Sequence, residues 1–167
     1  MSKSRLPNPK IVASPQKMIV GLKINMSLSE DRTASLWKNF GPLRKSVSNP
    51  MDGGSYSVQV YDTLLDDEPF LPTTIFEKWA GIRVKEVKEL PEGFEVLIIP
   101  AGDWAVFQYK GLARDFGKFM NSIVSEWLPS SPYDLEDRPH FEYMPEDYLG
   151  PNNPLSVEQV WIPIKKK

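Results

Sequence analysis

The 167-residue sequence contains no cysteine and a single histidine, His140. The absence of cysteine excludes disulfides, iron–sulfur clusters, thiolate zinc sites and cysteine nucleophiles. One histidine excludes a multi-histidine metal site, and we expect neither a metal nor a cofactor. A Ser-His-Asp triad would need His140, which lies in a proline-flanked segment. Acid–base chemistry near neutral pH is therefore expected from carboxylates, tyrosine or lysine.

Long apolar runs and a strong charge of one sign are also missing. The longest aliphatic run, 96–99, is far shorter than the roughly 18 apolar residues of a membrane helix. With 20 basic and 22 acidic side chains, the chain has a net charge of −2, which argues against binding nucleic acid or an anionic membrane. The N-terminus has no apolar signal core, so we expect a cytoplasmic protein.

The sequence is well supplied with aromatic residues: five Trp, six Tyr and eight Phe. Aromatic side chains fill cores and ligand pockets alike. Glu142 lies within the aromatic and apolar segment 140–144, where it either faces solvent or is buried among Phe and Tyr side chains. A buried carboxylate ringed by aromatic groups is suited to hold a lipophilic cation, and burial would raise its pKa in the empty pocket.

Hydrophobic periodicity predicts the same order of elements twice. Residues 18–26 alternate as a strand does, and the spacing of Ser27 and Glu30 is that of a capping box at the start of a helix. The apolar residues of 116–128 repeat with helical period, and Pro129 is expected to end that helix. The predicted elements are 18–26, 28–40, 56–61 and 79–87 in the first half, and 94–99, 104–109, 113–128, 138–143 and 157–164 in the second.

This order indicates an internal duplication, because the strands that start near Met18 and Asp103 and the helices that start near Leu28 and Ala113 are both offset by 85 positions. We predict an α+β fold of two pseudo-symmetric β-α-β-β halves that face each other across a central ligand cleft, with the helices outside. Residues 1–16 are expected to form an N-terminal arm. Residues 17–165 are expected to form a single domain with halves at about 17–88 and 89–165.

Several motifs resemble those of the GyrI-like small-molecule-binding family, which includes the effector-binding domains of AraC- and MerR-type regulators. The resemblance covers about residues 10–165 and is strongest after residue 76. The motifs are FEKWAG at 76–81, LPxGFxV at 90–96, IPAGxWAVFxYxG at 99–111, EWLPSS at 126–131, RPxFE at 138–142 and VWIPIK at 160–165.

The resemblance implies a duplicated β-α-β-β module that binds hydrophobic, often cationic compounds in its central cleft. It places the pocket carboxylate of the family on Glu142. A second acid in the last strand of several regulators corresponds to Gln159, two residues before Trp161, so one charge is expected to be missing here. The expected ligand-contacting residues are Glu142, Trp161, Gln159, Trp104, Trp79, Phe141, Tyr109 and Tyr56.

The leading hypothesis is a stand-alone binding protein that senses or sequesters a hydrophobic, aromatic compound, either neutral or cationic. The alternative is a hydrolase that opens strained, cyclopropane-bearing alkylating compounds. Glu142 would then act as general base, with a hydroxyl group from Tyr109 or Tyr143. A third hypothesis, a protein-binding module of the gyrase-inhibitor kind, has no encoded partner surface to support it.

Overall fold

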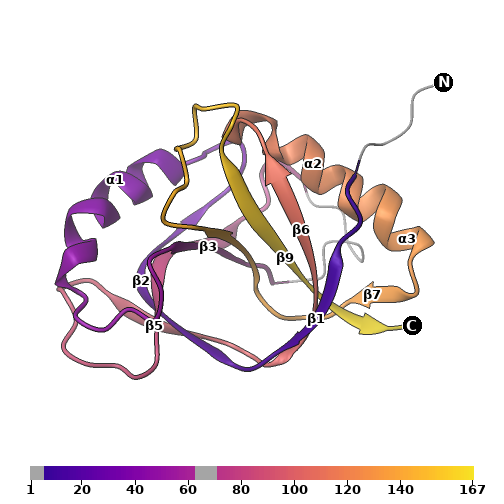
Figure 1. Ribbon diagram of the computed structural model, residues 1–167. Helices are drawn as coiled ribbons and strands as arrows, with labels where there is room; N and C mark the ends of the chain where they lie inside the picture. Colours follow the sequence, from indigo (N-terminus) through magenta and orange to yellow (C-terminus); the bar gives the residue numbers. More distant parts are fainter. Residues whose placement is uncertain (1–5, 63–70) are drawn as a thin grey trace.

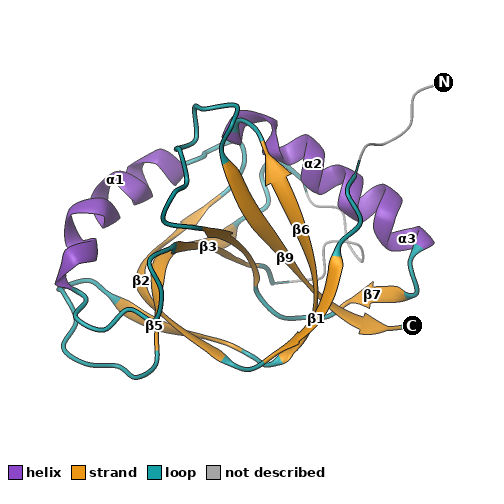
Figure 2. Ribbon diagram, in the orientation of Figure 1, coloured by secondary structure: helices purple, strands orange, loops and turns teal. Residues whose placement is uncertain are grey.

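One antiparallel sheet organises the computed structural model, which describes residues 6–62 and 71–167 (Figure 2). The strands follow one another in space in the order β1-β6-β9-β8-β3-β4-β2-β5, and β7 pairs with β9. They are β1 (Lys10–Ser14), β2 (Lys17–Met26), β3 (Ser55–Val60), β4 (Phe76–Val84), β5 (Glu95–Ile99), β6 (Gly102–Lys110), β7 (Tyr133–Leu135), β8 (His140–Met144) and β9 (Val157–Lys166).

Two helical segments accompany the sheet, one in each half of the chain (Figure 1). The first is α1 (Thr33–Leu43), followed by a 3₁₀ turn at Arg44–Ser46. The second begins with a 3₁₀ turn at Ala113–Asp115 and continues through α2 (Phe116–Ser122), a π-helical turn (Ile123–Trp127) and α3 (Leu128–Ser130). The predicted α+β class is confirmed. Within the described ranges, no helix is both long and apolar enough to cross a membrane.

The pairing order of the strands repeats between the halves. The first half has the order β3-β4-β2 and the second has β8-β9-β6, and the two meet where β3 pairs with β8. The strand that precedes each half pairs with the other half, because β1 pairs with β6 and β5 pairs with β2. The crossed strands tie the halves together. Superposition of the two halves stays a prediction.

The structure corrects three local predictions. Glu30 N–H does donate to the Ser27 hydroxyl at 3.2 Å, but the helix begins only at Thr33 because the turn is held elsewhere, by the Ser29 N–H bond to Pro72 O at 2.9 Å. Pro129 does not end the second helix, which continues to Ser130, because proline is tolerated in a first helical turn such as that of α3. Residues 10–14 of the predicted arm form β1.

Three buried clusters share the two faces of the sheet. The helices pack over one face in two separate cores, with α1 over β2 and β4 and the second helical segment over β6 and β9. The third cluster lies on the opposite face. Its fully or nearly fully buried members are Ile19, Tyr56, Val58, Trp79, Ile99, Trp104 and Phe141.

Candidate functional site

A polar seam separates the two cores on the helix-covered face. The register joins one residue from each of six neighbouring strands into a row. The outer residues of this row belong to or pack against the helix-side cores, whereas the two central ones, Glu142 and Ser57, are polar. In order across the sheet, the row is Phe107, Val160, Glu142, Ser57, Ala80 and Leu22.

Glu142 lies at the centre of this seam and is only 5% exposed. Gln59, two residues beyond Ser57 on β3, donates a hydrogen bond from Nε2 to Glu142 Oε1 at 3.0 Å. Burial raises the pKa of the Glu142 carboxyl, and this effect is opposed by nearby Lys78 and by the hydrogen bonds of Gln59 and Ser57. The carboxyl is therefore held in place but incompletely compensated.

Glu158 brings a second buried carboxyl to the same face. Glu142 is opposite Val160 on β9, so Glu158 is displaced from it by two residues along the neighbouring strand, which keeps both acids on one face. Burial raises the pKa of Glu158 to about 8, with repulsion from Glu142 adding to it and Lys78 opposing it. Among residues 6–62 and 71–167, no Lys, Arg or His lies within 4 Å of either carboxylate.

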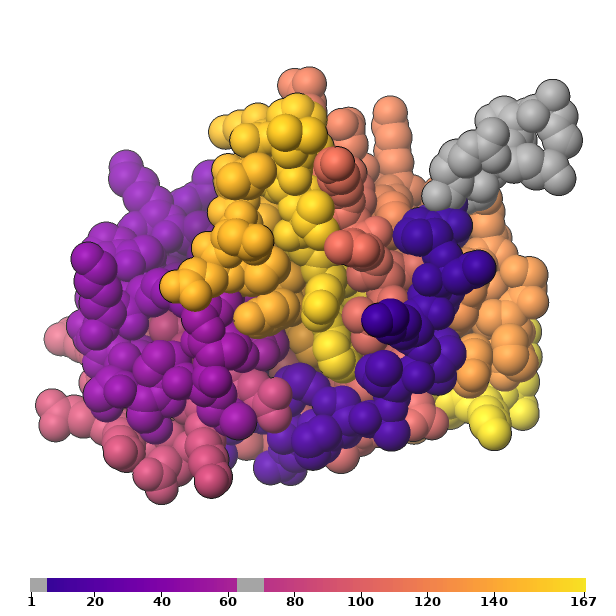
Figure 3. All heavy atoms as spheres, viewed as in Figure 1, coloured from indigo at the N-terminus to yellow at the C-terminus, as the bar shows by residue number. Residues whose placement is uncertain are grey.

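The connection between β8 and β9, residues 145–156, covers the seam. Tyr148 of this segment is half-buried, and burial together with Glu158, Tyr109 and Glu142 raises its pKa to about 12. The segment is fastened to the start of the second helical region, where Ala113 N–H donates to Pro151 O at 2.9 Å. In the ribbon and space-filling views, its gold chain runs between the first half and β6 (Figure 1, Figure 3).

Two predicted site residues, Glu142 and Tyr109, share the helix-covered face. Tyr109 is opposite Glu158 in the register and is 7% exposed. Its hydroxyl donates to Leu112 O at 2.5 Å. Burial, together with Asp115 and Glu158, raises the Tyr109 pKa. The pKa of Tyr61 is also raised by burial and by Glu142, so tyrosines approach the acids from several segments.

The other predicted ligand contacts lie on the opposite face of the sheet. Phe141 stacks on Trp161 with ring centres 5.1 Å apart, and Trp104 meets both rings edge-on. Phe141 and Tyr143 therefore do not surround Glu142, because neighbouring residues of a strand point to opposite faces. The predicted ligand contacts that lie on this face are Tyr56, Trp79, Trp104, Phe141, Gln159 and Trp161.

Trp161 and Gln159 do share a face, as predicted, and Trp161 Nε1 donates to Gln159 Oε1 at 3.0 Å. Sequence reasoning missed Glu158. The available signal was strand parity: Glu158 alternates in phase with Val160 and Ile162 of the helix-side core, whereas Gln159 does not. Position 159 thus lacks the second acid of the family, as expected, but Glu158, one residue earlier, supplies an acid on the same face as Glu142.

The chain thus folds as one antiparallel sheet with two helical segments and a buried acidic seam on the helix-covered face. The chain belongs to the GyrI-like family: the model of the GyrI-like small molecule binding domain matches residues 7–165. It is 28% identical over 156 residues to the transcriptional regulator BrlR of Pseudomonas aeruginosa, an alignment that covers 93% of this chain and 54% of BrlR. The chain thus spans about half the length of this relative.

Solved structures share the fold. SAV2435 bound to tetraphenylphosphonium has a TM-score of 0.71 and 12% identity, with 95% of this chain and 94% of that chain covered. The C-terminal domain of EcmrR has a TM-score of 0.64 and 15% identity, with 95% and 97% covered. A hydrolase from Listeria innocua has a TM-score of 0.56 and 7% identity, with 95% and 92% covered.

Proposed function

We propose that the polar seam binds a lipophilic, aromatic organic cation, so that the protein senses or sequesters such compounds. The observation that carries this proposal is the pair of buried acids, Glu142 and Glu158, which have no ion-pair partner in the part of the chain that the structure describes. A buried carboxylate without a counter-charge is costly. A cationic ligand would supply the counter-charge, and its apolar groups would contact the flanking cores.

The polar groups around the acids have distinct roles in this proposal. Glu142 supplies charge at the centre of the site, and its hydrogen bond from Gln59 fixes the orientation of the carboxylate. Glu158 adds a second charge, and Tyr148 contributes a ring from the covering segment. Membership of a small-molecule-binding family supports the proposal, as does the fold shared with a protein that binds tetraphenylphosphonium.

Calorimetric titration with tetraphenylphosphonium tests the proposal. We expect Glu142→Gln and Glu158→Gln each to lower its affinity at least tenfold, because a hydrogen bond or contact to a charged group contributes about 1.5–3 kcal/mol. Binding of neutral triphenylphosphine oxide should change far less. The matched control is Glu146→Gln, which removes an exposed acid from the covering segment. Equal losses in all three variants, or no binding to the wild type, would contradict the proposal.

The tyrosine-flanked acid pair also suits a second candidate function, hydrolysis of a strained electrophilic ring. An acid whose pKa is raised to about 8 can donate a proton near neutrality, while a neighbouring carboxylate activates water. Water would add across the ring, its hydroxyl to the opened carbon and its proton to the leaving atom. Mass spectrometry after incubation distinguishes the two functions, since hydrolysis adds the mass of one water and binding leaves the compound unchanged.

A further inference from the structure

Three basic side chains gather on the sheet face opposite the polar seam, around Trp104. Lys17 is 3% exposed, and its Nζ lies 4.6 Å from the ring centre of Trp161 and 5.8 Å from that of Trp104. Arg138 stacks over Trp104, with Cζ 4.5 Å from the ring centre. Arg83 of β4 is opposite Ile19 of the same cluster, and both arginines lie near enough to Lys17 to lower its pKa. We call Lys17, Arg83 and Arg138, together with Trp104, the basic cluster.

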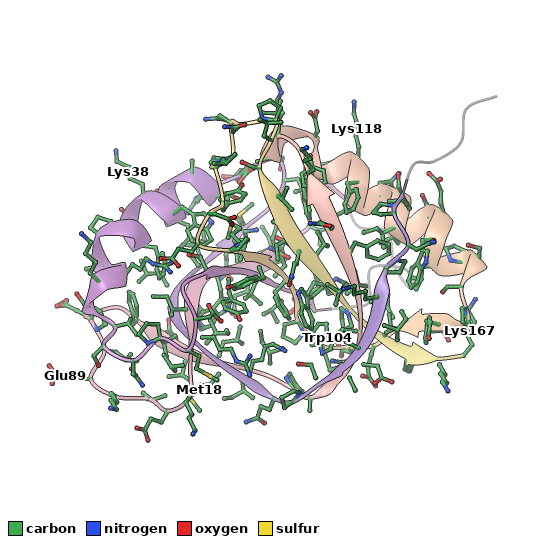
Figure 4. All side chains as sticks on the ribbon, viewed as in Figure 1. Met18, Lys38, Glu89, Trp104, Lys118 and Lys167 are labelled. Carbon is green, nitrogen blue, oxygen red and sulfur yellow. The ribbon has the colours of Figure 1, made fainter. Side chains whose placement is uncertain are left out.

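Several donors of the basic cluster are buried without an acceptor. Trp104 is fully buried, and its Nε1 has no hydrogen-bond partner in the described ranges. Arg83 Nε and Arg138 Nη1 are also buried without a hydrogen-bond partner in the described ranges, and the Arg138 side chain as a whole is only 6% exposed. Buried donors are rarely left unpaired in proteins. Figure 4 shows Trp104 in the interior of the molecule, where the curved strands enclose it.

The nearby acids leave this cluster with surplus positive charge. Arg138 Nε pairs with Glu136 at 2.6 Å, but within residues 6–62 and 71–167 no carboxylate lies within 4 Å of Lys17 or Arg83. Asp52 accepts a hydrogen bond from the Tyr56 hydroxyl at 3.0 Å and forms no ion pair with Lys17 or Arg83. Lys17 donates to the Ser14 hydroxyl, a neutral group. Repulsion among like charges in a poorly hydrated site is substantial.

We propose that the basic cluster is a binding site for a small monovalent anion, of the size of chloride or formate. The anion would accept hydrogen bonds from Trp104 Nε1, Arg83 Nε and Arg138 Nη1, which lack acceptors, and would neutralise Lys17. The ligand must be small, because Trp104 and Phe141 are fully buried and close against each other, with ring centres 5.2 Å apart. The site lies on the other face from Glu142 and does not depend on the proposed cation binding.

Halide dependence of stability tests this site in the full chain. At constant ionic strength, replacing gluconate by chloride or bromide should raise Tm in a saturable way, because a ligand that binds only the folded state stabilises it. Lys17→Met and Arg83→Met should abolish the difference between anions. Lys110→Met, which removes an exposed cation from β6, should retain it. The same Tm in chloride, formate and gluconate for the wild type would overturn the proposal.

A direct observation does not depend on the variants folding. A crystal of the wild type grown in bromide should show an anomalous peak within hydrogen-bond distance of Trp104 Nε1. Formate in place of bromide distinguishes a carboxylate-selective site from a halide site, by whichever anion gives the larger saturable rise in Tm. Absence of the bromide peak, together with no preference for formate over gluconate, would show that the donors are satisfied in another way.

Discussion

Glu142 and Glu158 lie on neighbouring strands and on one face of the sheet, two residues out of register, and each raises the cost of ionising the other. Burial raises both pKa values, and repulsion from Glu142 adds to the rise at Glu158, whose pKa is about 8. The empty seam therefore retains at least one proton at neutral pH. Any ligand that needs both carboxylates ionised must displace that proton, which couples ligand binding and folding stability to pH.

We expect the free energy of unfolding of the ligand-free protein to fall as pH rises from about 6.5 to 8. Across this range the native state keeps a proton on Glu158 that the unfolded chain has released, since an unperturbed Glu has a pKa of about 4.3. The expected slope is up to about 1.36 kcal/mol per pH unit for one proton. Urea unfolding at several pH values measures it.

This pH window separates Glu158 from His140 and Lys17, whereas Glu142 contributes with the same sign as Glu158 because its pKa is also raised. Burial lowers the pKa of His140 to about 3, so its destabilising effect is confined to acid pH, below the His value of about 6.5 in unfolded chains. The pKa of Lys17 is lowered to about 8 by burial, Arg83 and Arg138, so its opposite contribution grows only toward the upper end of the window. Glu158→Gln should flatten the slope, and Glu146→Gln should leave it. A steep slope in Glu158→Gln would assign the proton elsewhere.

The two faces of the sheet predict opposite mutational outcomes. Phe141 is fully buried in the cluster opposite the seam, so Phe141→Leu should lower the free energy of unfolding by about 1–3 kcal/mol through imperfect repacking. The affinity of this variant for tetraphenylphosphonium should stay within about twofold of the wild type, a change of about 0.4 kcal/mol, because Phe141 faces away from the polar seam. A tenfold loss of affinity at unchanged stability would place the ligand on the aromatic face.

Periodicity predicted the elements that bury one regular face. The strand β2 and the second helical segment were found because their apolar residues repeat at two and about 3.6 positions. Strand β1 and strand β7 were not found, because β1 is mostly exposed on its own and β7 has three residues. Both strands form only by pairing with another strand, β1 with β6 and β7 with β9. Such pairing produces no periodic pattern of apolar residues within the strand's own sequence.

The candidate site was predicted only as far as one strand allows. The family resemblance identified Glu142, but the surroundings of that residue depend on how β8 aligns with β3 and β9. Phe141 and Tyr143 adjoin Glu142 in sequence and face away from it, whereas Gln59 and Glu158 are distant in sequence and share its face. Alignment between strands is a tertiary property, so Gln59 could not be assigned from its own segment, and for Glu158 strand parity indicates the face but not the neighbouring residue.

The crossed strand β1 should contribute to stability although much of it is exposed. It forms five register pairs with β6, from Lys10 opposite Val106 to Ser14 opposite Gly102. Deleting residues 1–14 removes these hydrogen bonds, leaves β6 as an open edge and takes Ser14 away from Lys17. We expect Tm to fall by at least about 2–4 °C, the change that corresponds to 1 kcal/mol in a chain of this size. An unchanged Tm would show that β1 is dispensable.

Affinity for a permanent cation should move with pH in the opposite direction to ligand-free stability. Tetraphenylphosphonium has no titratable group, so any pH dependence of its binding comes from the protein. It should bind best to the fully ionised acid pair. Between about pH 6.5 and 8 its association constant should therefore rise, by up to about tenfold per pH unit if one proton is released, and level off above the Glu158 pKa of about 8.

Proton release gives an independent measure of the same coupling. Calorimetric titrations at pH 7 in buffers of different ionisation enthalpy should show that binding of tetraphenylphosphonium releases close to one proton per site. Glu158→Gln removes the group that holds this proton, so its binding should be weaker, independent of buffer and nearly independent of pH. Triphenylphosphine oxide, which is neutral, should release no proton from the wild type. Buffer-independent binding of tetraphenylphosphonium to the wild type would mean that it binds away from the acid pair.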